Sequence, residues 1–94
     1  MTYKLDFYED ALKEWRKLDG TVREQFRIKL KDRLENPRVP AAKLRDAPNR
    51  YKIKLKSVGY RLVYEVLDKE IVVVVVAIGK RNRNEIYRIA AKRL

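Results

Sequence analysis

The chain contains no histidine and no cysteine among its 94 residues. Without histidine it lacks the side chain whose charge ordinarily changes near neutral pH, so any acid–base chemistry must use other groups. Without cysteine it has no thiol nucleophile and no disulfide, which fits a reducing compartment. Zinc and haem sites depend largely on these two residue types. We therefore expect no metal site and no cofactor.

Glycine and long apolar segments are also scarce. The chain has only three glycines, too few for a glycine-rich phosphate-binding loop. It contains no run of eighteen apolar residues that could span a bilayer. The N-terminus lacks the apolar segment of a signal peptide. These absences predict a cytoplasmic protein that does not span a membrane.

Positive charge is abundant. Lysine and arginine number 24 against 13 aspartates and glutamates, which gives a formal charge of +11 at pH 7. A field of this strength attracts polyanions before any specific contact forms. The candidate partners are nucleic acid, an anionic membrane surface and an acidic protein. A chain of this length forms one domain, residues 1–94, with a single core.

The N-terminal third predicts a strand and two helices. Apolar residues alternate in a short first strand over residues 3–7, and then recur at helical spacing through Trp15, which we assign to the core. Gly20 is expected to end this first helix. Thr21 and Glu24 match a capping box that begins a second helix. Its apolar stripe runs to the Asn36-Pro37 stop and comprises Val22, Phe26, Leu30 and Leu34.

The rest of the chain predicts a loop at 37–49, three strands at 50–56, 60–67 and 70–78, and a helix at 82–94. Residues 71–78 are apolar without interruption, which indicates a central strand buried on both faces. The sequence therefore predicts an α+β fold of order β-α-α-β-β-β-α. Two N-terminal helices cover one face of an antiparallel four-stranded sheet, and a C-terminal helix completes the domain.

The hairpin formed by the predicted strands at 50–56 and 60–67 alternates apolar and cationic residues. A two-residue loop at Val58-Gly59 matches apolar with apolar residues across the pair, whereas a three-residue loop mixes the two faces. This register sets Lys56 opposite Arg61 and Lys52 opposite Glu65. It places Lys52, Lys54, Lys56 and Arg61 on one face.

A row of cations has two interpretations. It is either a solvated sheet face or a platform that binds phosphate, and the repulsion between like charges favours the platform. Residues 79–83 leave the central strand and open the last helix, whose N-terminus suits phosphate but not arginine. Tyr87 shares a helix face with Arg83 and lies either in the core or on the surface. Basic grooves with a tyrosine are typical of RNA binding.

These segments together resemble the RelE toxins of the RelE/ParE toxin–antitoxin superfamily, from Leu5 to the C-terminus. The residues that carry the likeness are 11–18, 43–45, 51–55, 59–64, 79–81 and Tyr87. Basic strands with Gly-Tyr-Arg are common to the superfamily. The full set of Lys52, Lys54, Arg81 and Tyr87 is more specific to the RelE type.

The resemblance implies the toxin of a type II system, a metal-independent endoribonuclease that cuts mRNA in the ribosomal A site and inhibits translation. The ribose 2′-hydroxyl would attack the adjacent phosphate. Tyr87 would act as base, Arg81 would assist the leaving oxygen, and Lys52, Lys54 and Arg61 would stabilise the phosphorane. The cations expected to bind other RNA phosphates are Lys43, Arg45, Lys56, Lys80 and Arg83.

The resemblance also implies partners: the ribosome with its 16S rRNA, mRNA, an acidic RelB-like antitoxin, and operator DNA only through the antitoxin complex. It implies no membrane partner. The antitoxin could cover the lysine row. It could instead displace the helix at 82–94, which we expect to be the least stable element because its apolar stripe is narrow. Two alternatives remain: a ParE-like toxin that poisons gyrase, and an RNA- or ribosome-binding protein without catalysis.

Overall fold

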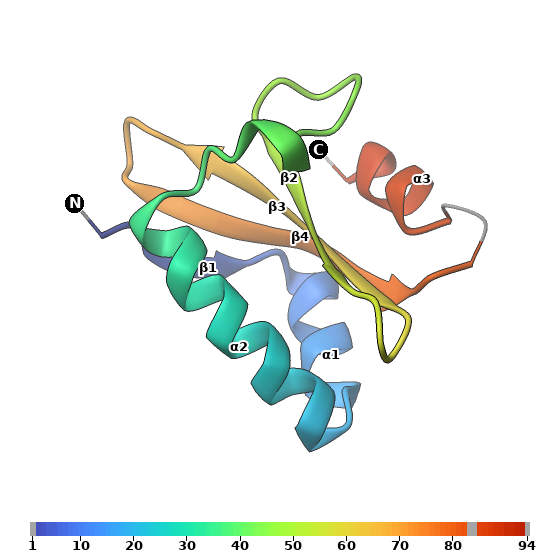
Figure 1. Cartoon of the computed structure of the whole chain (residues 1–94). Helices are drawn as coiled ribbons and strands as arrows, with labels where there is room; N and C mark the ends of the chain where they lie inside the picture. Colours follow the sequence, from blue (N-terminus) through green and yellow to red (C-terminus); the bar gives the residue numbers. More distant parts are fainter. Residues whose placement is uncertain (1, 83–84, 94) are drawn as a thin grey trace.

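The structure is a computed structural model, and it describes residues 2–82 and 85–93. The order of elements is β1 (Lys4–Phe7), α1 (Glu9–Lys17), α2 (Gly20–Glu35), a short 3₁₀ helix η1 (Pro40–Ala42), β2 (Arg50–Leu55), β3 (Tyr60–Leu67), β4 (Val72–Lys80) and α3 (Glu85–Lys92). The strands form one sheet in the order β1-β4-β3-β2 (Figure 1). The predicted order of elements is confirmed.

One strand pair differs from the predicted antiparallel sheet. β1 runs parallel to β4, whereas β2–β3 and β3–β4 are antiparallel. The reason lies in the path of the two helices between β1 and β2. The backbone N–H of Tyr3 donates to the carbonyl of Leu34 at 2.9 Å, so α2 ends beside the start of β1. The chain therefore enters β2 in the direction of β1, and two further reversals make β4 parallel to β1.

Helices α1 and α2 cover one face of the sheet, as predicted (Figure 1). The predicted stripe of α2 faces the core, where Val22, Phe26 and Leu30 are buried and Leu34 is half-buried. Trp15 packs against this core with its ring centroid 5.3 Å from that of Phe7, which confirms its assignment.

The end of α1 and the start of α2 differ from the prediction. The side chain of Asp19 caps α2 by accepting from the Thr21 N–H at 3.3 Å, so Thr21 is not the capping residue. Aspartate is at least as good a cap as threonine, and it begins the helix earlier. Gly20 consequently lies in the first turn of α2 rather than ending α1, whose last residue is Lys17. Glu24 pairs with Arg27 instead of closing a capping box.

The central strand β4 is buried on both faces from Val73 to Ile78, as predicted. A bulge at Val76 interrupts its pairing with β3, because Val63 pairs with Ala77 while the next residue pairs with Val75. Because of the bulge, Val76 and Ala77 both pack in a second cluster of buried apolar residues, separate from the core under α1 and α2. This cluster also contains Val63 and the helix residues Ile86 and Ala90. Helix α3 therefore lies on the sheet face opposite α1 and α2.

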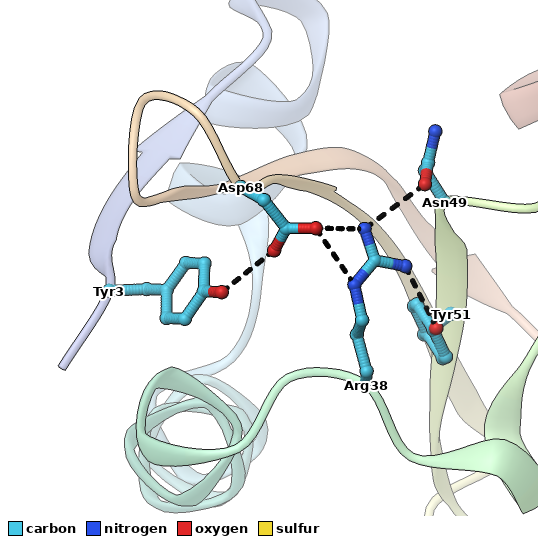
Figure 2. Close-up of polar contacts among 5 residues, drawn as sticks. All are labelled: Tyr3, Arg38, Asn49, Tyr51 and Asp68. Carbon is cyan, nitrogen blue, oxygen red and sulfur yellow. Dashed lines mark hydrogen bonds and ion pairs between the residues drawn. The ribbon is translucent and has the colours of Figure 1, made fainter. Parts of the chain in front are cut away.

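A polar network joins separate segments at the end of the sheet where β3 turns into β4 (Figure 2). Arg38 donates to the Asp68 carboxylate from Nε at 3.1 Å and from Nη2 at 2.6 Å. The same guanidinium donates to Asn49 and to the Tyr51 hydroxyl, and the Tyr3 hydroxyl donates to Asp68 at 2.7 Å.

No helix in the described part of the chain combines the length and apolar character that crossing a membrane requires.

Candidate functional site

The β2–β3 hairpin carries the predicted cations, but its register differs from the prediction by two residues. Lys54 lies opposite Arg61, and Arg50, rather than Lys52, lies opposite Glu65. The loop comprises residues 56–59, and Gly59 closes it at φ +69° with its N–H donating to the Leu55 carbonyl at 2.9 Å. Because the shift is even, Lys52, Lys54 and Arg61 still share one face, as predicted.

The end of β4 brings a further cation to this hairpin. Gly79 and Lys80 pair with Arg61 and Tyr60, so β4 extends two residues beyond its predicted end. The Arg81 N–H then donates to the Gly59 carbonyl at 2.6 Å. The resulting hollow of about 140 Å³ is lined by Lys54, Lys56, Gly59, Tyr60, Arg61 and Arg81. We call Lys52, Lys54, Lys56, Arg61 and Arg81 the basic platform.

Tyr87 of α3 lies against the basic platform. The Lys52 Nζ is 5.9 Å from the centroid of its ring, and the Arg61 Cζ is 5.4 Å from it, which are cation–π distances. The Tyr87 hydroxyl is buried and has no hydrogen-bond partner among the residues that the structure describes. The structure thus brings together all five residues expected to be catalytic, namely Lys52, Lys54, Arg61, Arg81 and Tyr87.

Four of the five cations in the basic platform have no acidic partner among the described residues. In the described part of the chain, no ion pair joins Lys52, Lys54, Lys56 or Arg81 to a carboxylate. The pKa of Lys54 lies below its usual value, chiefly because of the charge on Lys52. Some desolvation of this exposed side chain and the charges on Arg61, Lys56 and Arg81 lower it further. Crowding by like charges therefore disfavours the protonated form of Lys54.

The seat of α3 includes contacts that the sequence analysis did not identify. Ile86 packs so closely on Gly79 that a Cβ there would lie 3.1 Å from its Cδ1. Arg93 donates to Glu14 and to the Val76 carbonyl, each at 2.9 Å. Arg50, which pairs with Glu65 at 2.7 Å, also donates to carbonyls at the end of α3. These polar contacts weigh against the expectation that α3 is the least stable element, which stays a prediction.

A larger hollow of about 550 Å³ lies beside Lys52 and Tyr87. It is lined by residues 44–50 together with Lys52, Glu65, Tyr87, Ala90 and Ala91. Arg45, one of the cations expected to bind RNA, therefore lies near the basic platform.

The other expected RNA-binding cations are placed differently. Lys56 belongs to the basic platform, and Lys80 is exposed at the end of β4. The backbone of Lys43 forms an isolated antiparallel β-bridge with that of Tyr51, whose side chain packs in the core on the side of α2. Lys43 lines neither hollow. Arg83 and part of the predicted N-terminus of the last helix lie outside the described residues.

The chemistry open to this site is that of cations and a phenol. The described residues contain no group of three or more histidines, cysteines, aspartates or glutamates that could hold a metal ion. A cluster of fixed cations stabilises negative charge that develops on a phosphate, and a phenol can exchange a proton. The arrangement suits transfer or cleavage at a phosphodiester.

Sequence comparison identifies similar proteins. A family described as the ParE toxin of the type II toxin–antitoxin system parDE matches residues 5–85. The mRNA interferase toxin RelE of Escherichia coli (strain K12) is 60% identical over 94 residues, which are 100% of this chain and 99% of that protein. The mRNA interferase RelE of Shigella flexneri matches to the same extent.

Solved structures agree. A variant of E. coli RelE in the free state, with two arginines replaced by alanine, superposes with a TM-score of 0.92 at 57% identity, covering 100% of this chain and 99% of that chain. RelE in the intact E. coli RelBE toxin–antitoxin complex superposes with a TM-score of 0.83 at 60% identity, covering 86% of this chain and 99% of that one. The resemblance seen in the sequence is confirmed.

Proposed function

We propose that this chain, which belongs to the RelE mRNA interferases of the RelE/ParE toxin family, cuts mRNA in the ribosomal A site and so inhibits translation. The observation that carries the proposal is the contact of Tyr87 with the cations of the basic platform. Lys52, Lys54, Lys56 and Arg81, which no ion pair in the described part of the chain joins to a carboxylate, are complementary to a phosphate that gains charge in the transition state.

The reaction is a transesterification within the RNA. The ribose 2′-oxygen forms a bond to the adjacent phosphorus while the bond from phosphorus to the 5′-oxygen of the next nucleotide breaks. The products are a 2′,3′-cyclic phosphate and a free 5′-hydroxyl. One proton leaves the 2′-hydroxyl and one reaches the 5′-oxygen, so the protein must accept one proton and supply another.

The described geometry suggests how these roles divide. Tyr87 accepts the proton of the 2′-hydroxyl, and Lys52 and Arg61, which already contact its ring, stabilise the phosphorane charge. Lys54, whose pKa lies below its usual value, supplies the proton to the 5′-oxygen. Arg81 stabilises that oxygen by its charge, because a guanidinium hardly deprotonates. The Tyr87 hydroxyl is buried, so incoming RNA must draw the covering side chains aside.

Other cations hold the rest of the RNA. Lys56 lines the small hollow, Lys80 is exposed at the end of β4, and Arg45 lines the large hollow. These three cations bind phosphates on either side of the cut. Lys43 does not lie on the platform and contacts ribosomal RNA instead. Arg83 completes the set. Each phosphate contact strengthens binding and makes it depend on salt.

An acidic antitoxin is the expected regulator. The E. coli relative has been solved in a complex with RelB, and a charge of +11 on this chain speeds encounter with an acidic partner. Such a pair would act in the cytoplasm and bind its operator DNA as a complex. Hydrogen exchange separates two routes of inhibition. Faster exchange in α3 on binding indicates displacement, and new protection at residues 51–61 alone indicates that the platform is covered.

Primer extension on translating ribosomes tests the proposed reaction. We expect cuts in register with codons when the protein is added, and much slower but still measurable cleavage with Tyr87→Phe. Cleavage should persist in excess chelator when only the magnesium needed by the ribosome is restored. Ribosome protection without cuts would support a binding protein instead. Inhibition of DNA gyrase without RNA cleavage would contradict the proposed reaction and support the ParE-like alternative instead.

A further inference from the structure

Arg50 is a buried charge that the proposed reaction does not use. It lies at the start of β2, on the same face as Lys52 and Lys54, and only 8% of its surface is exposed. Its Nε donates to Glu65 at 2.7 Å, directly across the hairpin. Burying a guanidinium is costly unless it is paired and hydrogen-bonded. The partners of its remaining N–H groups therefore indicate what the residue does.

Those partners belong mainly to the end of α3. Nη1 donates to the carbonyl of Ala90, and Nη2 donates to the carbonyl of Arg93. Nη2 also lies 3.5 Å from the Tyr8 hydroxyl. The Ala90 carbonyl also accepts from the backbone N–H of Arg93 at 3.0 Å, so Arg50 adds a second bond where the helix supplies none of its own. A cation at that end also complements the helix dipole. Arg50 of strand β2 thus caps the C-terminal end of helix α3.

This cap matters because apolar packing alone fixes α3 poorly. Only Ile86 and Ala90 of the helix are buried, and apolar contacts tolerate sliding and rotation. Two directed hydrogen bonds from one rigid guanidinium restrict both movements. Ala90 lies three residues after Tyr87, one turn along the helix. The position of the Ala90 carbonyl therefore sets where the Tyr87 ring lies over Lys52 and Arg61.

We propose that Arg50, held in place by Glu65, is a positioning residue for Tyr87. The proposal rests on the proposed function only where it concerns cleavage, because the placement of α3 can be measured separately. The hydrogen bonds of Arg50 go to Glu65, to Tyr8 and to the end of α3, so it fixes the helix that carries the proposed base. Glu65 keeps the guanidinium oriented and balances its charge.

Three variants of this pair should fall in a fixed order. Arg50→Met removes every hydrogen bond and should loosen α3 the most. Arg50→Lys keeps the charge, but an ammonium cannot span the carboxylate and two carbonyls, so it should rescue only part of the loss. Glu65→Gln keeps an acceptor opposite Arg50 and should have the smallest effect. The matched control is Arg38→Met, because Arg38 also pairs with a carboxylate but lies in the network with Asp68.

Hydrogen exchange at the amides of residues 87–92 is the first measurement. We expect Arg50→Met to accelerate exchange there, with Arg38→Met unchanged in the same segment. The second measurement is single-turnover cleavage at saturating ribosome. Arg50→Met should slow it by roughly 10- to 100-fold, the usual cost of a misplaced catalytic group, without weakening ribosome binding. In the background of Tyr87→Phe, Arg50→Met should slow cleavage no further.

The outcomes separate the two proposals. Unchanged exchange in α3 of Arg50→Met would overturn the positioning role, whatever the cleavage rate. Faster exchange together with a normal rate for Tyr87→Phe would keep the positioning of α3 and sink the assignment of Tyr87 as base. If Arg50→Met fails to fold, Arg50→Lys and Glu65→Gln decide the question by the same two measurements, and wild-type behaviour in both would overturn the inference.

Discussion

Arginine side chains differ at the two ends of the β2–β3–β4 part of the sheet: their charge is paired with a carboxylate at one end and not at the other. At the end where β3 turns into β4, Arg38 is saturated by Asp68, Asn49 and Tyr51 (Figure 2). At the other end, the described structure joins Arg81 to no carboxylate. The same side chain is therefore part of the fold at one end, where its charge is neutralised. At the other end it remains available to an anion.

The pKa values follow the same division. Hydrogen bonds from Arg38 and then Tyr3 hold the pKa of Asp68 below its usual value. The charge of Lys52 holds the pKa of Lys54 below its own usual value. In the first case the charged form of the group is favoured by folding, and in the second it is disfavoured. The basic platform thus costs stability in the absence of RNA, and the Arg38 network contributes it.

The largest difference between the two ends should appear in the cleavage rate. We expect Arg81→Ala to slow single-turnover cleavage at saturating ribosome by roughly 100- to 1,000-fold, the usual cost of removing one preorganised donor to the transition state. Arg38→Met should leave that rate unchanged. Equal rates for Arg81→Ala and the wild type would show that the charge at this position does not serve the cut phosphate.

The pH dependence of cleavage tests the proton donor. Lys54 must be protonated to donate, so the rate of the wild type divided by that of Lys54→Arg should fall as pH rises through the pKa of Lys54, about tenfold per unit above it. Because that pKa is lowered, the fall should begin below the value of about 10.4 that is usual for lysine. The rate of Lys54→Arg should be lower but should not fall over this range, since arginine stays protonated. Comparing rates at pH 7 to 9.5 checks this.

Lys56→Arg is the control for that profile, because it preserves charge on the basic platform without touching the proposed donor. It should retain the wild-type alkaline fall. If Lys54→Arg shows the same fall as the wild type, another group supplies the proton.

The sequence predicted the fold in outline because apolar periodicity decides each element separately. It could not decide the direction of β1, which depends on where the α1–α2 pair returns the chain. It also misplaced the hairpin register. Alternation has period two, so loops of two and of four residues match the same faces, and only the closure of Gly59 onto Leu55 distinguishes them.

The candidate site was predictable in its strand residues and not in its helix. Lys52, Lys54 and Arg61 lie on one face in any even register, so their convergence follows from the pattern. The place of Tyr87 depends on how α3 sits, which Arg50, Arg93 and Gly79 determine through tertiary contacts. Arg50 has the same parity as Lys52, so alternation could have placed it on this face. Its pairing with Glu65 required the correct register.

Ribosome binding should distinguish cations on the basic platform from those elsewhere. Lys56 lines the small hollow, so Lys56→Gln should weaken binding several-fold and reduce the slope of log affinity against log salt by roughly 0.7 to 0.9, the loss of about one phosphate contact. A titration of ribosome binding at several salt concentrations gives this slope. Lys69→Gln, in the β3–β4 turn, is the control and should change little. Identical slopes for the two variants would remove the distinction.

The Arg38 network should be visible in stability rather than in rate. Arg38→Met should lower Tm by a few degrees. The exposed carboxylate of Asp68 loses its ion pair, and the hydroxyl of the buried Tyr51 loses a hydrogen-bond donor. The lowered pKa of Asp68 sets the pH dependence. Its contribution is present above the usual aspartate value of about 3.9 and disappears as pH falls through the lowered value. The Tm difference measured at pH 7 should therefore shrink toward pH 2.

The smallest expected effect has the opposite sign. Lys54 lies directly opposite Arg61 across the hairpin, and like charges in that position are destabilising. Lys54→Met should therefore raise the free energy of unfolding by on the order of 0.5 kcal/mol, the scale of an exposed charge pair, while impairing cleavage. Urea unfolding at low and high salt measures it. High salt should reduce the gain, because it screens the repulsion that the substitution removes.

Raising the pH should also reduce that gain. The folded protein lowers the pKa of Lys54, so its charge destabilises the fold at neutral pH, and the penalty is lost as pH rises through the lowered pKa and then past the usual lysine value. Lys69→Met is the matched control. It removes a lysine beside Asp68 and Glu70 and should leave stability unchanged or slightly lower. A loss of stability in Lys54→Met equal to that in Lys69→Met would show that the basic platform carries no strain for RNA binding to relieve.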